Sequence, residues 1–419
     1  MKRLLPLVTA ALFAGAAVAA DWPQWRGPDR TGISREKGLL KEWPGGGPKL
    51  LWSARNLGEG YSGPAVVGGR LYSAGSDRKG DSQFVFCLDA NTGKELWRTD
   101  FAPYFPQGYG GGPRSTPTVD GDRLYVLGGG GELACLRTED GSKLWDVNLR
   151  KDLGGKMMSG WGYSESVLVD GDKVICTPGG GKGTLAALDK MTGEVIWRST
   201  GLTDDAAYSS VIVHEAGGVR HYVQMTGRAV VGVKPEDGSL LWRNTSLSLR
   251  TAAIPTPIAK GEHVFATSGY GAGCVLIKLT PDGKGGLRSE EVYTSRDMSN
   301  HHGGVILLGD HVYGHNDRRE GWVCMELLSG KLAWSQPKFP KGSITYADGH
   351  FYCYSERDGA LACIEASAKG WNEVGRLKIP EQSKIRSARG RIWTHPVVAG
   401  GKLFLRDQDL MFCYDLKGK

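Results

Sequence analysis

The residues of this sequence that are able to do chemistry gather just ahead of eight similar segments. When the segments are aligned on Pro117, the aligned position holds only Pro, Val or Ile, whereas the two positions two and three residues earlier vary widely. Packing between similar segments requires similar residues, so polar variety at one level indicates a lined site. The varied pairs are Tyr61/Ser62, Arg114/Ser115, Ser164/Glu165, Tyr208/Ser209, Ile254/Pro255, His302/Gly303, Lys341/Gly342 and Trp393/Thr394.

These residue types suit a ligand that has both charge and a flat surface. Arg114 and Lys341 would meet anionic groups, Glu165 would accept hydrogen bonds or coordinate a cation, and aromatic side chains would stack on a ring. The candidate ligand-binding set is Tyr61, Arg114, Trp161, Glu165, Tyr208, His302, Lys341, Trp393 and His395. The alternative is that these side chains satisfy one another around ordered water, for example through an Arg114–Glu165 ion pair.

Other polar motifs carry weaker signals. Asn300-His301-His302, with His315 and His395, has the composition of a metal site. Adjacent residues of a strand point to opposite faces, however, so we expect no metal centre here. The glycine runs at 108–112 and 179–183 lack the spacing of a phosphate loop and the helix that follows one, which favours hairpin turns. No Ser-His-Asp or Cys-His arrangement stands out in the sequence, so no catalytic residue is assigned.

The elements that must position these residues are repeated strand–turn–strand units. Cys87, Cys135, Ala187, Gly232 and Met325 each open a stretch that ends in Gly-x-x-x-Trp. Each stretch predicts two strands joined by a tight turn, in which Gly adopts positive φ. The tryptophans are expected to dock neighbouring sheets against one another; these are Trp52, Trp97, Trp145, Trp197, Trp242 and Trp334.

The spacing of the repeats predicts a closed ring. Landmarks equivalent to Cys87 fall at 87, 135, 187, 232, 277, 325, 363 and 413, which indicates eight sheets of about four strands each. Residues 49–52 resemble the last strand of a repeat, and residues 410–416 resemble a third strand without its partner. We therefore predict an all-β, eight-bladed β-propeller of four-stranded antiparallel blades, with the N-terminal strand completing the last blade.

The ends of the chain and its cysteines bear on location. Lys2-Arg3, an apolar core and small residues predict a signal peptide over 1–20, followed by an irregular leader at 21–48 and the propeller at 49–419. No Cys follows the cleavage site, so we expect an exported, periplasmic or extracellular monomer without a membrane anchor. Loss of Lys2 and Arg3 lowers the formal charge from +7 to +5, which is too diffuse to indicate a nucleic-acid partner. The eight cysteines are expected to be small buried residues, with a Cys353–Cys363 bridge left open.

The pattern Ala-x-Asp-x-x-Thr-Gly-x-x-x-Trp at 187–197 resembles the pyrroloquinoline quinone (PQQ) repeat. The resemblance extends from Lys49 to the end of the chain, and the leader Trp22-Pro23-Gln24-Trp25-Arg26-Gly27-Pro28 is similar to that of exported proteins with PQQ-like repeats. It implies the propeller of the quinoprotein dehydrogenases and of the outer-membrane-protein assembly factor B family. The chain lacks the adjacent cysteines and the calcium-binding motif of the dehydrogenases, and it lacks the lipid-bearing cysteine of the assembly factor.

Two functions follow from this resemblance. The first is a binding or assembly scaffold that holds a protein, peptide or carbohydrate-like ligand at the mouth of the central channel. The second is an oxidoreductase that acts on alcohols or sugars with PQQ and calcium bound at the same mouth. The sequence leaves open whether the chain is an enzyme.

Overall fold

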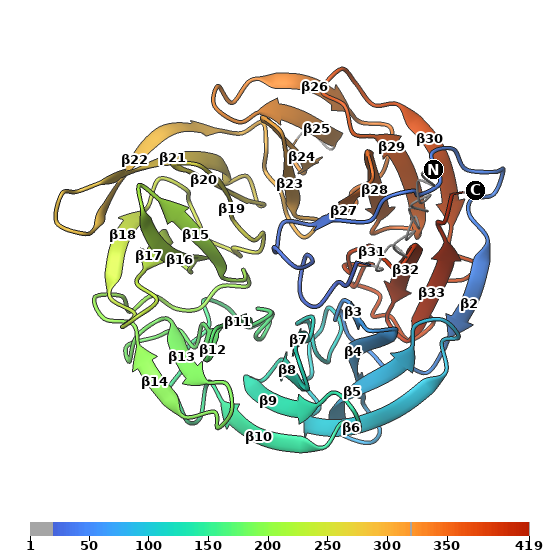
Figure 1. Cartoon of the computed structure of the whole chain (residues 1–419), viewed down its shortest axis with the longest axis horizontal. Coiled ribbons are helices and arrows are strands. Elements are labelled where there is room, and N and C mark those ends of the chain that lie inside the picture. Colours follow the sequence, from blue (N-terminus) through green and yellow to red (C-terminus); the bar gives the residue numbers. More distant parts are fainter. Residues whose placement is uncertain (1–19, 319–320, 419) are drawn as a thin grey trace, which may run out of the picture.

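The computed structural model describes residues 20–318 and 321–418, so the predicted signal peptide at 1–20 lies, except for its last residue, outside the described residues. The described chain is all-β and forms eight sheets around a central channel, as Figure 1 shows. None of these residues forms a helix long and apolar enough to cross a membrane. The predicted fold class, an eight-bladed β-propeller, is confirmed.

Each of the first four blades is a simple antiparallel meander in which the first strand lies innermost (Figure 1). Blade 1 contains β3 (Ala65–Val67), β4 (Arg70–Asp77), β5 (Ser82–Asp89) and β6 (Glu95–Pro103). Blade 2 contains β7 (Thr118–Asp120), β8 (Arg123–Leu127), β9 (Glu132–Arg137) and β10 (Lys143–Asn148). Blade 3 contains β11 (Leu168–Asp170), β12 (Lys173–Cys176), β13 (Ala186–Asp189) and β14 (Val195–Arg198). Blade 4 contains β15 (Ile212–Ala216), β16 (Val219–Met225), β17 (Val230–Val233) and β18 (Leu240–Asn244).

The remaining blades follow the same plan, and two of them also use the N-terminal segment. Blade 5 contains β19 (Ile258–Lys260), β20 (His263–Ser268), β21 (Gly273–Pro281) and β22 (Leu287–Ser295). Blade 6 contains β23 (Val305–Leu308), β24 (His311–Asn316), β25 (Gly321–Glu326) and β26 (Leu332–Gln336). Blade 7 contains β27 (Gly342–Ala347), β28 (His350–Ser355), β29 (Ala360–Glu365) and β30 (Glu373–Lys378), and β1 (Ile33–Ser34) adds to it in parallel. Blade 8 contains β31 (Val397–Ala399), β32 (Lys402–Asp407), β33 (Leu410–Asp415) and β2 (Leu50–Ala54).

The N-terminal strand closes the ring. β2 pairs antiparallel with β33, and Trp52 lies opposite Cys413 in the register. The fourth strand of the last blade therefore comes from the start of the propeller, as predicted. A ring closed in this way leaves no open edge at the junction of its first and last blades.

The repeated tryptophans bridge from one blade to the next. In blades 1, 2, 3, 6 and 8 the indole Nε1 donates to a backbone carbonyl of the following blade; the pairs are Trp97–Thr138, Trp145–Lys190, Trp197–Pro235, Trp334–Ser367 and Trp52–Ala90, at 2.9–3.2 Å. In blades 1, 2, 3 and 8 the indole also lies on the turn glycine of the following blade. A Cβ on Gly193 would come within 2.8 Å of Trp145, and Gly193 adopts φ 79°. The repeat thus requires glycine both for the turn and for the close approach of the ring.

Blades 5 and 7 fill the same position differently. In blade 5 Tyr293 lies opposite Leu276 and donates to the carbonyl of Leu327 at 2.7 Å. In blade 7 the position is Gly375, and Trp43 of the leader packs there instead.

The register also corrects two of the sequence landmarks. The residues opposite the docking aromatic are Leu276 and Cys324, so the predicted landmarks Ile277 and Met325 are each one residue too late. A β-bulge follows the docking position in these blades, but it also follows that position in blades 1, 3 and 4, so it is not the cause. In blades 1 to 4 the landmark lies six residues before the turn glycine, and Cys324, not Met325, keeps that spacing before Gly330.

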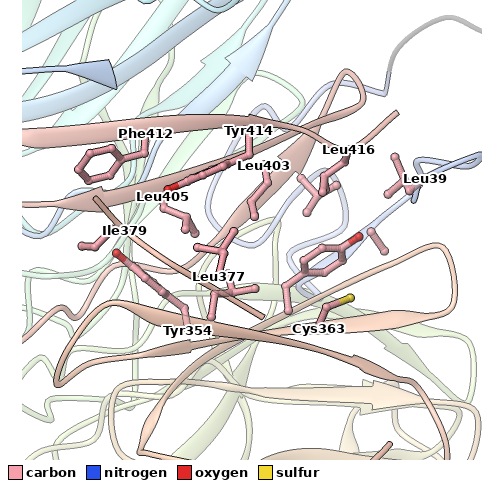
Figure 2. Packing of buried hydrophobic residues seen from close by; sticks show 14 of the residues in the cluster. Leu39, Tyr354, Cys363, Leu377, Ile379, Leu403, Leu405, Phe412, Tyr414 and Leu416 are labelled. Carbon is pink, nitrogen blue, oxygen red and sulfur yellow. The ribbon is translucent and has the colours of Figure 1, made fainter. Parts of the chain in front are cut away.

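Buried apolar side chains fill the spaces between the blades, and Figure 2 shows the space between blades 7 and 8. Leu39 of the leader joins Leu377, Leu403 and Phe412 in this cluster. All eight cysteines are buried and free. Cys353 and Cys363 do not form the bridge left open above, because they lie on opposite faces of their sheet and pack into different clusters.

The leader enters the central channel and contacts the innermost segments of seven blades. The segment from Trp22 to Ser34 makes every one of these contacts. The contacts are Trp22–Val66, Pro23–Val119, Arg30–Val167, Trp25–Thr256, Arg26–Val305, Gly32–Tyr346 and Ser34–Val398. The buried guanidinium groups of Arg26 and Arg30 donate to carbonyl groups that the short inner strands leave without a ladder partner. The leader is therefore the axial plug of the ring.

Candidate functional site

A cavity of about 360 Å³ opens at one mouth of the channel. Its walls are made by the segments that lead into the innermost strands, together with the turn that contains Tyr270 between β20 and β21. The residues that line it are Trp25, Tyr61, Gln107, Tyr109, Arg114, Trp161, Ser164, Ser166, Tyr208, Ser210, Thr251, Ile254, Pro255, Thr256, Tyr270, His301, His302, Gly304, Trp393 and His395.

Seven of the nine residues expected at the site line this cavity: Tyr61, Arg114, Trp161, Tyr208, His302, Trp393 and His395. Ser164 and Ile254, which occupy the same aligned position as Arg114, line it as well. The position three residues before the one aligned with Pro117 therefore faces the cavity in seven of the eight repeats. The following residue turns away from the cavity in most repeats, as the buried hydroxyls of Ser62, Ser115 and Ser209 show, but Pro255 lines it beside Ile254.

Aromatic rings form two groups on the wall. In the first group His302 stacks on Trp393 with a centroid distance of 4.5 Å, and Tyr61 lies 5.0 Å from Trp393. In the second group Trp161 lies between Tyr208, at 6.0 Å, and Tyr109, at 6.4 Å. The rings of each group hold one another in place, which gives the cavity flat and rigid sides.

Trp25 forms the floor. Its indole Nε1 donates to Thr256 Oγ1 at 2.9 Å, and its ring meets His395 edge-on at 4.6 Å. Beneath it the leader fills the channel, so the cavity is closed at its inner end. Trp25 therefore lies within the channel and faces the cavity.

Arg114 is the cavity's one side chain with a permanent charge. Its Nη1 and Nη2 donate to the carbonyls of Gly112 and Gly110 at 2.5 and 2.8 Å, and its guanidinium lies over the ring of Phe105. Burial lowers the pKa of Arg114 to about 10, so the group stays protonated at neutral pH. Among the described residues it takes part in no ion pair with a carboxylate.

The three histidines of the cavity are neutral at physiological pH. Burial, with Lys341 nearby, lowers the pKa of His301 to about 4. Burial and Arg26 lower the pKa of His395 to about 3, and its Nε2 donates to the carbonyl of His302 at 2.9 Å. The pKa of His302 is held well below its usual range by burial and by the other imidazoles.

Glu165 does not reach the cavity, contrary to expectation. It is the residue after Ser164, so its side chain points between the blades. There it accepts hydrogen bonds from the backbone and hydroxyl of Thr177 and from Gln224, at 2.7–3.1 Å. Burial raises its pKa to about 7, against the opposing charge of Arg30. It has no ion pair with Arg114; its cationic neighbour comes from the leader instead.

Lys341 also lies outside the cavity. Its ammonium donates to His301 Nδ1 at 2.6 Å and to Asp317 at 2.8 Å, and it lies 3.9 Å from Glu356. Glu356 in turn accepts a hydrogen bond from Trp393 Nε1 at 3.1 Å. Lys341 is therefore a positioning residue behind the histidine wall, not a wall residue itself.

The histidine pair corrects a second expectation. His301 and His302 precede β23 rather than lying on a strand, so the rule of opposite faces does not apply. Their rings lie 3.7 Å apart and both line the cavity. No group of three or more metal-binding side chains occurs within residues 20–318 and 321–418.

Sequence reasoning missed Trp25, Tyr109 and Tyr270. Tyr109 lies in the glycine run at 108–112, which the sequence suggested was only a turn. A Cβ on Gly110 would collide with the hydroxyl of Tyr61, so the run lets this loop pack against the wall of the cavity. An aromatic residue within a glycine-rich connection between blades was the available signal.

The lining fits PQQ only in part. Flat aromatic walls and Arg114 suit a conjugated acid. Calcium, however, takes six to eight oxygen ligands that commonly include carboxylates, and the described lining contains no Asp or Glu. The residues present therefore do not fit a calcium-bound tricarboxylate.

Comparisons with known proteins agree with this architecture. A protein-family model described as outer membrane protein assembly factor BamB matches residues 81–336, more than half of the chain. The outer membrane protein assembly factor BamB of Shewanella oneidensis is 25% identical over 395 residues, covering 86% of both chains.

Solved structures share the fold at lower identity. BamB from Moraxella catarrhalis superposes with a TM-score of 0.61 at 15% identity, covering 88% of this chain and 98% of that one. Quinohemoprotein alcohol dehydrogenase from Comamonas testosteroni gives 0.63 at 13% identity, covering 95% and 81%. These likenesses show the propeller fold alone. The match to the family model goes further: this chain belongs to the PQQ-like repeat propeller family described as outer membrane protein assembly factor BamB.

Proposed function

We propose that this chain is an exported binding or assembly scaffold that holds a segment of a partner molecule in the cavity at the channel mouth. The observation that carries the proposal is the cavity itself, which has aromatic sides, a closed floor and one partly buried cation on a rigid ring. The relatives named as assembly factors favour a protein or peptide partner over a carbohydrate-like one.

The chemistry of the lining supports binding rather than proton transfer. General acid–base catalysis works best when the pKa of the catalytic group lies near the working pH. The pKa values of His301 and His395 lie near 4 and 3, and the described lining contains no carboxylate. The aromatic rings and Arg114 of the lining suit the binding of a flat ligand that carries a negative charge.

Photo-cross-linking from the rim tests the scaffold function. Tyr109 is 41% exposed at the cavity, whereas Leu328 is 56% exposed in the turn between β25 and β26, at the opposite end of the strands. A photo-reactive residue at 109, in cells that make the chain, should capture the same partner in every replicate, and one at 328 should not. Equal capture at both positions, or none at 109, would contradict the proposal.

A PQQ-dependent oxidoreductase is the second candidate, favoured by the aromatic walls and Arg114. Because the lining lacks carboxylates for calcium, we expect it to fail a direct test. PQQ and calcium should be added to the folded chain, and both the spectrum of a bound chromophore and dye reduction with alcohols or sugars should be measured. Appearance of both signals would replace the scaffold proposal with the enzyme.

A further inference from the structure

We propose that the cavity recognises an aromatic ring that carries one carboxylate, with the carboxylate on Arg114 and the ring between the two aromatic groups of the wall. This inference rests on the proposed binding function and names the chemistry of the bound group. The same chemistry is presented by a free aromatic acid and by the C-terminal aromatic residue of a polypeptide.

The charge balance of the cavity supports an anion. Arg114 is partly buried, and the carboxylate of Glu59, which is not part of the lining, acts on its charge without an ion pair. A cation partly removed from water is stabilised by a partner of opposite charge or by several hydrogen bonds. Arg114 has two carbonyl acceptors from its own loop, and these hydrogen bonds use two of its five N–H groups. A carboxylate fits the planar fork of a guanidinium and can accept two of the remaining N–H groups.

The position of Arg114 fixes where a ring would lie. Going around the channel, Arg114 precedes blade 2, between Tyr61 before blade 1 and Trp161 before blade 3. The hydroxyls of Tyr61 and Tyr208 both lie near enough to raise the pKa of Arg114, so both aromatic groups border the guanidinium. A carboxylate on Arg114 therefore directs its ring into the space between Tyr61–Trp393 and Trp161–Tyr208.

The rest of the lining limits the ligand to one charge. The opposite wall consists of Ile254, Tyr270 and the neutral imidazoles of His301 and His302. A second carboxylate there would be removed from water without a cation to meet it, which is costly. A volume of about 360 Å³ is at the small end of ligand sites and suits one or two fused rings.

The decisive experiment compares acid and amide on the unaltered protein. Tryptophan fluorescence reports binding, because Trp25, Trp161 and Trp393 line the cavity. One arm uses 2-naphthoate and 2-naphthamide. The other uses a short peptide ending in tryptophan, with either a free or an amidated C-terminus. In at least one arm the carboxylate form should bind about tenfold or more tightly, because a charge-assisted hydrogen bond is lost in the amide.

Two variants locate the preference. Arg114→Gln should remove the discrimination between acid and amide, whereas Arg137→Gln, at an exposed position on β9 outside the lining, should keep it. A preference in the naphthoate arm alone identifies a free acid, and one in the peptide arm alone identifies a polypeptide terminus.

Equal binding of acid and amide in both arms, no binding in either, or a preference that survives Arg114→Gln would overturn the inference. The comparison on the unaltered protein holds even if Arg114→Gln fails to fold. Cross-linking from position 109 remains an independent test, so a scaffold with a different ligand would still capture its partner when both arms fail.

Discussion

Trp43 of the leader packs against Gly375 of blade 7, at the position where other blades carry their own tryptophan. A Cβ on Gly375 would come within 2.5 Å of the Trp43 side chain, and the backbone N–H of Trp43 donates to the carbonyl of Val374. The missing side chain of one segment thus makes room for the ring of another. The leader is as much a part of the ring as the blades are.

Loss of this indole should weaken the whole propeller. Trp43→Ala removes a large ring from the interior, and such truncations cost about 3–5 kcal/mol. Gly375→Ala should also destabilise the native chain, but it should cost little in the Trp43→Ala background, where the clash is absent. Denaturant unfolding of the four proteins measures this coupling, and additive effects of the two changes would contradict it.

The fold was largely predictable because each repeat carries its own local signal. Turn glycines, alternating apolar residues and docking tryptophans recur in the repeats. The closure by Trp52 was predictable because the N-terminal end has a fourth strand without a repeat before it, and the C-terminal end has a third strand without a fourth. The role of Trp43 was not predictable, because the ring that fills the position in blade 7 comes from the distant leader. The role of Tyr293 was missed because blade 5 carries Tyr where the repeat has Trp. The one-residue errors at Leu276 and Cys324 arose from the alignment: the landmark chosen in blade 6 lies one residue closer to its turn glycine than the landmarks of blades 1 to 4 do, and blade 5 has no Gly-x-x-x-Trp ending to align on.

The candidate site was predictable in part because the same aligned position, just ahead of the innermost strand, faces the cavity in most repeats. Tyr61, Arg114 and Tyr208 share one register position, and all three face the cavity. Glu165, one residue beyond that position, faces the interior of the ring. Lys341 shares the register of Arg114 but turns away, because Asp317 and Glu356 attract its ammonium, and such a tertiary choice leaves no trace in the repeat.

Arg30 should be essential for the leader to hold its place. Its guanidinium donates to the carbonyls of Ser166 and Val167 and to Gln24 Oε1, and it lies near the charge of Glu165. Arg30→Met leaves these carbonyl groups buried and unpaired, and it should destabilise the fold by at least about 2 kcal/mol. Arg35→Met is the matched control, because that side chain is 64% exposed and its ion pair with Asp29 is worth little. Unfolding midpoints that are equal for the two variants would show that Arg30 is dispensable.

The cysteines should be inert in the native protein. All eight thiols are buried and free, and burial raises the pKa of Cys87, Cys363 and Cys413 to about 12. A thiol reagent should therefore label essentially none of them until denaturant is added, when all eight should react. The melting temperature should not change with a reductant. A drop on reduction would reveal a disulfide and contradict this arrangement.

Glu165 should make stability depend on pH in a direction unusual for a carboxylate. Burial raises its pKa from the usual 4.5 to about 7 in the folded chain, so the native state binds more protons than the unfolded state between these values. Its contribution is fully present below about pH 4.5 and is lost as the pH rises through 7. A shift of this size corresponds to about 3 kcal/mol. The buried histidines, whose pKa values are lowered, act in the opposite direction over pH 4–6.5, so the total slope cannot isolate Glu165.

The difference between the native chain and Glu165→Gln does isolate it. Glutamine cannot ionise, so the free energy of unfolding of the native chain relative to the variant should fall between about pH 5 and 7 and level off above the folded pKa of Glu165. The baseline cost of the lost hydrogen bond to Thr177 is the same at each pH and does not affect this slope. Asp140→Asn is the control, because that carboxylate is exposed in the turn between β9 and β10 and hydrogen bonds from Ser142 hold its pKa below its usual range, so it should give a flat difference over the same pH range. A flat difference for Glu165→Gln would show that the carboxylate is already ionised in the folded ring, and that Arg30 outweighs its burial.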